Sequence, residues 1–132
     1  MRVKLIILIF LLPLAAFNCK QTNKTKSPVE LITVEEMDSM LKVEEVRLID
    51  IRTPEEYKGG HIPGAINIDF RDKNFEKLMS KVDKTKPIAI YCGYGRRSSK
   101  CSEYMKKAGF IKIYDLDGGI IKWKFKGNPV VK

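Results

Sequence analysis

The sequence predicts an α/β fold in which a small, largely parallel sheet is flanked by helices. Short apolar runs typical of buried strands alternate with segments whose apolar residues recur at helical spacing. The chain has 132 residues, which is enough for one domain with one modest core. Its hydrophobic content of 44% and charged content of 31% are ordinary for a folded soluble protein. We therefore expect one folded domain over residues 29–132.

The expected strands and helices follow one another in a simple order. Strands are expected at residues 29–32, 46–51, 65–68, 88–91 and 111–114. Helices are expected from Val34 to about Lys42, a short one after Thr53, one over residues 75–82, one from about Lys100 to Ala108, and one from Ile120. Strands that alternate with helices indicate βαβ units and hence a parallel sheet.

Two helix starts carry capping boxes. Thr33 is followed three residues later by Glu36, and Thr53 is followed by Glu56. In each pair the threonine hydroxyl caps the helix, and the glutamate reaches back to the threonine N–H. Pro54 stands at the first helical position, which strengthens the second prediction.

The N-terminus has the pattern of an export signal. A short basic stretch precedes thirteen apolar residues, Leu5 to Phe17. These residues are too few for a membrane-spanning helix, which needs about 20. They suit the apolar part of a signal peptide over residues 1–18. Cys19 follows and resembles the lipidated cysteine of bacterial lipoproteins, although Phe17 and Asn18 replace the usual small residues. A plain cleaved signal and an uncleaved anchor are the alternatives. Residues 19–28 are polar and are expected to form a tether. The signal peptide, Cys19 and the tether together predict a domain in the cell envelope or periplasm, held to a membrane by a lipid anchor.

The charge of the chain does not indicate nucleic-acid binding. The formal net charge is +9, but the lysines are scattered and no nucleic-acid motif accompanies them. The expected result is a solvated basic surface with a mild preference for small anions.

The candidate active site is a cysteine loop between a strand and a helix. Cys92 ends an apolar run and is followed by Gly93, Tyr94, Gly95, Arg96, Arg97 and Ser98. The thiolate of a cysteine is the nucleophile, and it is favoured by cations and by unpaired N–H groups at a helix start. Asp50 also ends a strand, and the carboxyl ends of parallel strands meet at one edge of a sheet. We expect Asp50 and Cys92 to lie at the same edge.

Three segments together resemble one family. Residues 48–67, with Asp50-Ile51-Arg52-Thr53-Pro54 and Gly60-His61-Ile62-Pro63-Gly64, are similar to the first signature of rhodanese domains. The loop at residues 91–98 resembles their active-site loop, and residues 108–123 resemble their closing segment. The resemblance covers about residues 29–131 and identifies the chain as a member of the single-domain rhodaneses, which are thiosulfate sulfurtransferases.

The resemblance implies a mechanism. The Cys92 thiolate takes the sulfane sulfur of thiosulfate, releases sulfite and becomes a persulfide, which a thiol or cyanide then discharges. Residues 93–98 would bind the anionic donor, Asp50 and Arg52 would support the site by hydrogen bonds, and no metal or cofactor is required. We expect a monomer.

Several residues have plainer interpretations. Cys101 lies on the apolar stripe of its predicted helix, so core packing is favoured over a resolving thiol. His61 and Trp123 are interpreted as structural. Arg96 and Arg97 are either surface charges or substrate ligands, and Arg97 is the favoured ligand.

Two other functions are possible on this fold. A phosphatase of the same fold would need an arginine six positions after the cysteine, and Ser98 stands there. A non-enzymatic sulfur carrier or binding module of the envelope would keep the fold without turnover.

Overall fold

The computed structural model describes residues 26–43 and 46–132. The predicted signal peptide, Cys19 and most of the tether lie outside the described residues. Within the described ranges, no helix is long and apolar enough to cross a membrane.

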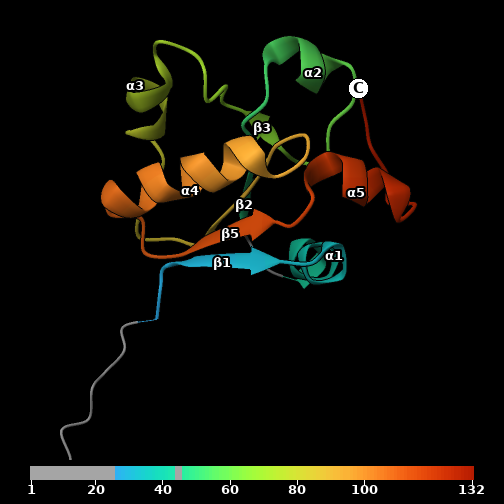
Figure 1. The fold of residues 1–132 in the computed structure, drawn as a ribbon, viewed down its shortest axis with the longest axis horizontal. Coiled ribbons are helices and arrows are strands. Elements are labelled where there is room, and N and C mark those ends of the chain that lie inside the picture. Colours follow the sequence, from blue (N-terminus) through green and yellow to red (C-terminus); the bar gives the residue numbers. More distant parts are fainter. Residues whose placement is uncertain (1–25, 44–45) are drawn as a thin grey trace, which may run out of the picture.

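The described part of the chain forms a five-stranded sheet in which every strand is parallel to its neighbours. The strand order is β1-β5-β4-β2-β3. The strands are β1 (Val29–Ile32), β2 (Arg47–Asp50), β3 (Ile66–Asn67), β4 (Ile88–Tyr91) and β5 (Ile113–Leu116). The predicted fold class is therefore confirmed, and β1 is the edge strand that the sequence predicts (Figure 1).

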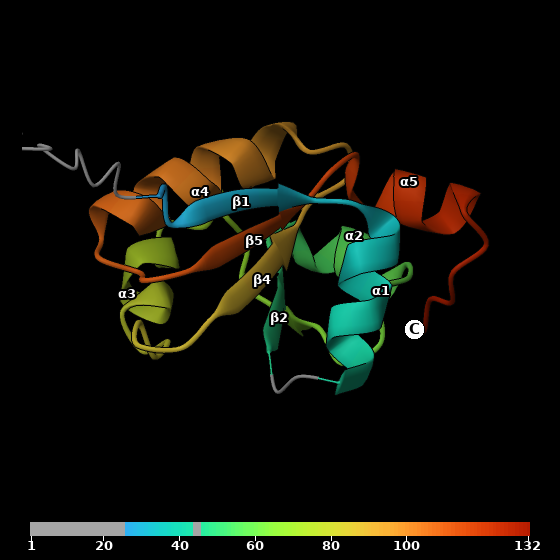
Figure 2. The ribbon, with the colours of Figure 1, turned by 90° about the horizontal axis from the view of Figure 1, so that it is seen from below.

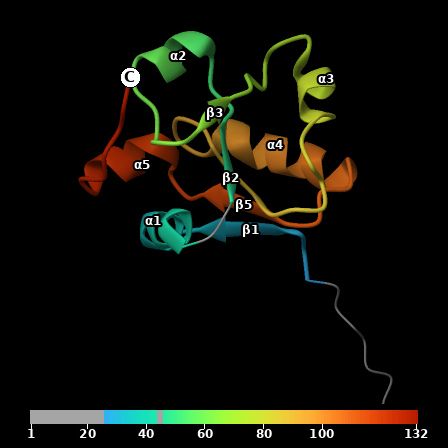
Figure 3. The same ribbon diagram turned by 180° about the vertical axis from the view of Figure 1, so that it is seen from behind.

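Helices cover both faces of the sheet. The helices are α1 (Val34–Val43), α2 (Pro54–Lys58), α3 (Phe75–Met79), α4 (Arg96–Lys107) and α5 (Gly119–Phe125). Seen from below, α3 and α4 lie on one side of the sheet, and α1, α2 and α5 lie on the other (Figure 2). The chain end returns beside α2 and α5 (Figures 1 and 3), where Val131 and His61 pair through their backbones.

Side chains alternate along β4 to fill two separate apolar layers. Ile88 and Ile90 face α3 and α4, whereas Ala89 and Tyr91 face α1 and α5. All four residues are buried, as expected for a central strand of a parallel sheet. Cys92 continues the alternation on the α4 side. The sulfur is thus placed by the pleat of the strand.

Both predicted capping boxes are confirmed. The N–H of Glu36 donates to the Thr33 hydroxyl at 3.1 Å, and the Thr33 N–H donates to the Glu36 carboxylate at 2.7 Å. Thr53 and Glu56 form the same reciprocal pair at the start of α2. Gly59 is the C-cap residue of that helix, and Gly60, with φ of 141°, turns the chain out of the helix after it.

Three predicted boundaries were wrong. Helix α4 begins at Arg96 and not at about Lys100, because Gly95, with φ of 101°, turns the chain directly into the helix. Strand β5 spans Ile113–Leu116, two residues later than predicted, and Ile111 is exposed. Helix α3 stops at Met79 with a C-cap at Ser80, and Val82 is buried beyond its end.

Candidate active site

Cys92 lies at the junction of β4 and α4. Strand β4 is central in the sheet, and Asp50 of β2 stands in register with Tyr91. The predicted meeting of Asp50 and Cys92 at one sheet edge is therefore correct at the level of the backbone. The side chains point to opposite faces, because Cys92 joins the α4 layer while Asp50 bonds with Arg52.

The sulfur of Cys92 accepts hydrogen bonds from the start of α4. The N–H of Gly95 is 3.1 Å from the Cys92 Sγ, and the N–H of Ser98 is 3.4 Å from it. The Ser98 hydroxyl lies 3.5 Å from the same sulfur. Unpaired N–H groups at a helix N-terminus stabilise an anion. The loop therefore presents donors that favour a thiolate or a bound anionic sulfur.

Helix α5 holds the cysteine loop from behind. The N–H of Ile120 donates to the Cys92 carbonyl at 2.9 Å, and the N–H of Ile121 donates to the Gly93 carbonyl at 3.2 Å. Gly119 permits this approach, because its φ is +60° and an added Cβ would lie 2.4 Å from the Gly93 carbonyl oxygen. Only glycine fits this position.

An open cavity of about 340 Å³ leads to the sulfur. Its lining consists of Arg71, Cys92, Tyr94, Arg96, Arg97 and Lys100. The sequence predicted four of these residues and missed Arg71 and Lys100. Lys100 lies one helical turn after Arg96, so a correct helix start would have placed the two on one face. The cavity has cations on its walls, which suits an anionic ligand.

Arg97 is engaged by a carboxylate that the sequence analysis did not connect with it. Its guanidinium makes two hydrogen bonds of 2.7 Å to the two carboxylate oxygens of Glu56. The Arg97 guanidinium lowers the pKa of Glu56 to about 2. Arg97 therefore reaches the cavity with much of its charge already paired, and Arg96, Arg71 and Lys100 carry the other positive charges there.

Asp50 and Arg52 form a buried ion pair beneath the site. The Arg52 Nη2 is 2.7 Å from Asp50 Oδ2 and also donates to the Gly60 carbonyl at 2.8 Å. The Asn67 amide donates to the carbonyls of Asp50 and Arg52. These bonds tie the end of β2 to β3 and to the turn after α2, and the supporting role of Asp50 and Arg52 in the reaction stays a prediction.

The remaining predicted structural residues are accounted for. His61 stacks on Tyr57 with ring centroids 3.7 Å apart, and its Nδ1 lies 3.0 Å from the Tyr57 carbonyl oxygen. Trp123 is buried and donates from Nε1 to the Pro129 carbonyl. Cys101 is fully buried, and burial raises the pKa of its thiol to about 12. Cys101 is therefore suited to packing rather than to exchange.

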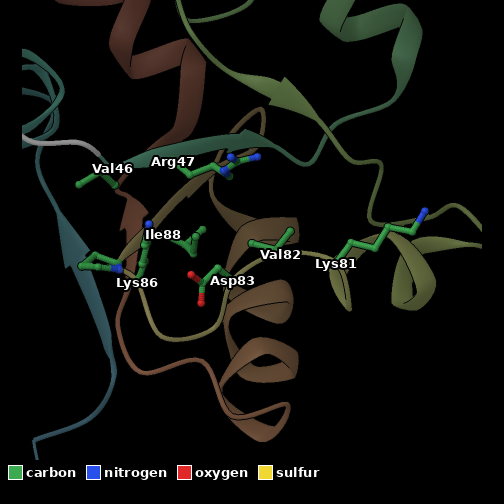
Figure 4. Close-up of a pocket in the computed structure, with 8 residues that line it drawn as sticks. Val46, Arg47, Lys81, Val82, Asp83, Lys86 and Ile88 are labelled. Atoms are coloured by element: carbon green, nitrogen blue, oxygen red, sulfur yellow. The ribbon is translucent and has the colours of Figure 1, made fainter.

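A second cavity of about 400 Å³ lies at the opposite end of the sheet. Its lining consists of Val46, Arg47, Lys81, Val82, Asp83, Lys86, Pro87 and Ile88. Figure 4 shows that the charged ends of Lys81 and Lys86 lie on opposite sides and do not converge. Its lining contains no cysteine, serine or histidine, whereas the other cavity contains Cys92, so the candidate active site is the cysteine loop.

Comparison with known proteins gives one consistent family. The rhodanese-like domain profile matches residues 33–126. The chain is 36% identical over 104 residues to a sulfurtransferase of Allochromatium vinosum, which covers 74% of this chain and 95% of that protein. It is 29% identical over 92 residues to the thiosulfate sulfurtransferase GlpE of Shewanella oneidensis, with 70% and 89% covered. A rhodanese-related protein from Thermoplasma volcanium has a similar structure, with a TM-score of 0.69, 28% identity, and 77% and 97% of the two chains covered.

Proposed function

Because the chain belongs to the rhodanese-like domain family, we propose that it is a sulfurtransferase that moves sulfane sulfur from thiosulfate to a thiophilic acceptor through a Cys92 persulfide. The relatives named above carry the names sulfurtransferase and thiosulfate sulfurtransferase. The observation that carries the proposal is the sulfur of Cys92 accepting two N–H groups at the start of α4. That geometry favours the ionised thiol that the reaction needs.

The first half-reaction uses the charge of the cavity. Thiosulfate is a dianion, and Arg71, Arg96 and Lys100 line the path to Cys92. The thiolate attacks the outer sulfur, the S–S bond of thiosulfate breaks, and sulfite leaves with the bonding electron pair. Cys92 then carries one additional sulfur. This persulfide is anionic, so the N–H groups of Gly95 and Ser98 can hold it as they hold the thiolate.

The second half-reaction restores the cysteine. A thiolate or cyanide attacks the outer sulfur of the persulfide, and the S–S bond breaks to return the Cys92 thiolate. The acceptor leaves as a persulfide or as thiocyanate. The enzyme alternates between two covalent states, which predicts ping-pong kinetics. Every step uses groups of this chain and its two substrates.

The site is less suited to phosphoryl chemistry. Arg97 is the last arginine of the loop, and both of its terminal nitrogens bond to Glu56. The next residue, Ser98, is buried, and its hydroxyl donates to the Gly95 carbonyl while its oxygen lies 3.5 Å from the Cys92 sulfur. A phosphate in this loop would therefore have no arginine, six positions after the cysteine, that could form hydrogen bonds with its oxygens.

We also propose that the domain works in the cell envelope, held to a membrane by a lipid on Cys19. The support is the basic and apolar N-terminus followed by a polar tether. Metabolic labelling with a radioactive fatty acid tests this directly. The full chain should incorporate the label, and Cys19→Ser should not. Label retained in Cys19→Ser would overturn the lipid anchor.

Steady-state kinetics test the proposed reaction. Thiosulfate should be varied against cyanide, glutathione and a dithiol, and double-reciprocal lines should be parallel. Cys92→Ser should lose turnover. Hydrolysis of p-nitrophenyl phosphate is the rival assay, and phosphatase activity without sulfur transfer would overturn the proposal. Covalent loading of Cys92 without turnover would instead indicate a sulfur carrier.

A further inference from the structure

The end of the sheet where the strands begin carries a group of exposed cations. Val29, Ile113, Ile88 and Arg47 open four of the strands and stand in register across the sheet. Around these strand starts lie the exposed side chains that we call the strand-start face: Arg47, Lys81, Lys86, Lys106, Lys107 and Ile111. No ion pair within residues 26–43 and 46–132 includes any of its five cations. The face therefore presents positive charge to whatever lies against it.

Hydrogen bonds hold the segments of this face together. The Ile111 N–H donates to the Lys84 carbonyl at 3.1 Å. The Lys84 Nζ donates to the Ala108 carbonyl at 2.7 Å, directly after the last turn of α4. Lys84 belongs to the same loop as Lys81 and Lys86. The end of α4, the loop before β4 and the approach to β5 therefore form one surface.

Acidic groups near the strand-start face are fewer than its cations. Asp83 lines the cavity at this end, and its carboxylate accepts hydrogen bonds from the N–H and the hydroxyl of Thr85. Glu30 is already paired with two lysines. The glutamates at positions 44 and 45 lie outside the described residues. The five cations thus exceed the carboxylates on this part of the surface.

The cations of this face are spread out and do not enclose a small ligand. Figure 4 shows that the charged ends of Lys81 and Lys86 point away from each other. Converging side chains would be expected around one bound anion. Separated cations on an exposed face suit a layer of many negative charges, such as anionic lipid headgroups.

The chain enters the domain at the strand-start face. The Pro28 carbonyl accepts the Ile113 N–H at 2.8 Å, and β1 follows directly. In Figure 1, β1 begins at the end of the domain away from α5, which is hydrogen-bonded to the cysteine loop. A fully extended chain from residue 20 to residue 28 spans about 30 Å. A domain of this size is also about 30 Å across, so a lipid on Cys19 would keep the strand-start face nearest to the membrane.

We propose that the strand-start face lies against anionic lipid headgroups and directs the cysteine loop away from the membrane. The inference rests on the proposed lipid anchor at Cys19 and not on sulfur transfer. The lipid would supply attachment, and the cations would supply orientation, because a basic patch beside a lipid anchor strengthens membrane binding. Ile111, which is 59% exposed, adds apolar contact at the level of the headgroups.

Vesicle sedimentation tests this surface. The full chain is mixed with vesicles of phosphatidylcholine alone, or with vesicles in which about a quarter of the lipid is phosphatidylglycerol. Every sample carries the same N-terminus, so the difference between the two vesicles reports the effect of headgroup charge. Wild type should bind the anionic vesicles about tenfold more tightly at low salt, and the preference should shrink at high salt.

A matched pair of double variants locates the charge that matters. Lys81→Gln with Lys86→Gln should weaken binding to anionic vesicles about fivefold to thirtyfold. Lys58→Gln with Lys124→Gln removes the same charge from α2 and α5, which follow the carboxyl ends of β2 and β5. This control should weaken binding less than about twofold. Equal losses in the two double variants would overturn the proposal, because binding would then follow total charge.

Alkylation of Cys92 reports the orientation. Arg71, Arg96 and Lys100 line the Cys92 cavity, so the reverse orientation is the rival. Iodoacetamide should modify Cys92 equally fast with and without anionic vesicles, as followed by peptide mass spectrometry. Slower modification on anionic vesicles would overturn the proposal.

Failure of the anchor and failure of this surface give different results. A preference for anionic vesicles that needs Lys81 and Lys86, in a chain whose Cys19 takes up no fatty acid, would refute the lipid anchor and support the face. A labelled Cys19 in a chain that binds both kinds of vesicle equally would support the anchor and overturn the face.

Discussion

Gly119→Ala should be among the most damaging single-methyl substitutions in this domain. The added Cβ would lie 2.4 Å from the Gly93 carbonyl oxygen and 2.5 Å from the Cys92 carbonyl oxygen, which are backbone atoms that cannot swing aside. Left-handed backbone geometry at a φ of +60° costs an alanine about 1–2 kcal/mol. Overpacking against a rigid neighbour adds about 1–3 kcal/mol. We expect a loss of about 2–5 kcal/mol in the free energy of unfolding.

Gly109→Ala is the matched control for this substitution. Gly109 also has a positive φ, of 91°, but an added Cβ would meet nothing within 4 Å. It should lose only the backbone term, about 1–2 kcal/mol. Urea denaturation measures both values. Gly119→Ala should also slow sulfur loading of Cys92, because α5 must move away from the loop. Equal losses in the two variants would refute the claim that α5 is packed against the cysteine loop at this point.

Three further predictions concern the charges and the second thiol. Glu56→Gln should lower the free energy of unfolding by about 1 kcal/mol at neutral pH, a value kept small because the carboxylate is 38% exposed. Because the pKa of Glu56 is lowered from 4.5 to about 2, the difference between wild type and variant should shrink as the pH falls from 4.5 to about 2. Denaturation at several pH values measures this difference, and a constant difference would contradict the prediction. Arg96→Gln should raise KM for thiosulfate about threefold to tenfold at low salt and less at high salt. Lys106→Gln, which removes a positive charge at the far end of α4, is the control. Equal changes of KM in the two variants would exclude a local role of Arg96 in binding thiosulfate. Cys101→Ala should retain sulfur transfer while stability falls by roughly 1 kcal/mol, and loss of transfer in a folded variant would show that Cys101 is more than packing.

The fold could be predicted because its signals are local. Both capping boxes and the buried run of β4 are set by residues within a few positions of one another. The order of strands and helices then leaves few topologies. The boundary of α4 was missed because Arg96 to Ser99 carry no apolar period. The first turn of this helix faces the sulfur and the cavity rather than the core.

The electrostatics of the site could be predicted less well, because they depend on residues far apart in the chain. Arg97 lines the cavity at Cys92, but its partner Glu56 is 41 positions away in the sequence. Glu56 was interpreted only as a capping residue, and it serves both purposes. Asp115 was missed because the strand was placed two residues too early. With the observed register, Asp115 faces inward, where a carboxyl group is unexpected.

The central claim is that Cys92 accepts a sulfur atom, and the mass of the protein tests it most directly. Brief treatment with thiosulfate should raise the mass of the Cys92 peptide by one sulfur atom, and subsequent cyanide should remove it. Cys92→Ser should show no gain, and Cys101→Ala should load as the wild type does. An unmodified Cys92 in folded protein, or a sulfur carried on Cys101, would contradict the account.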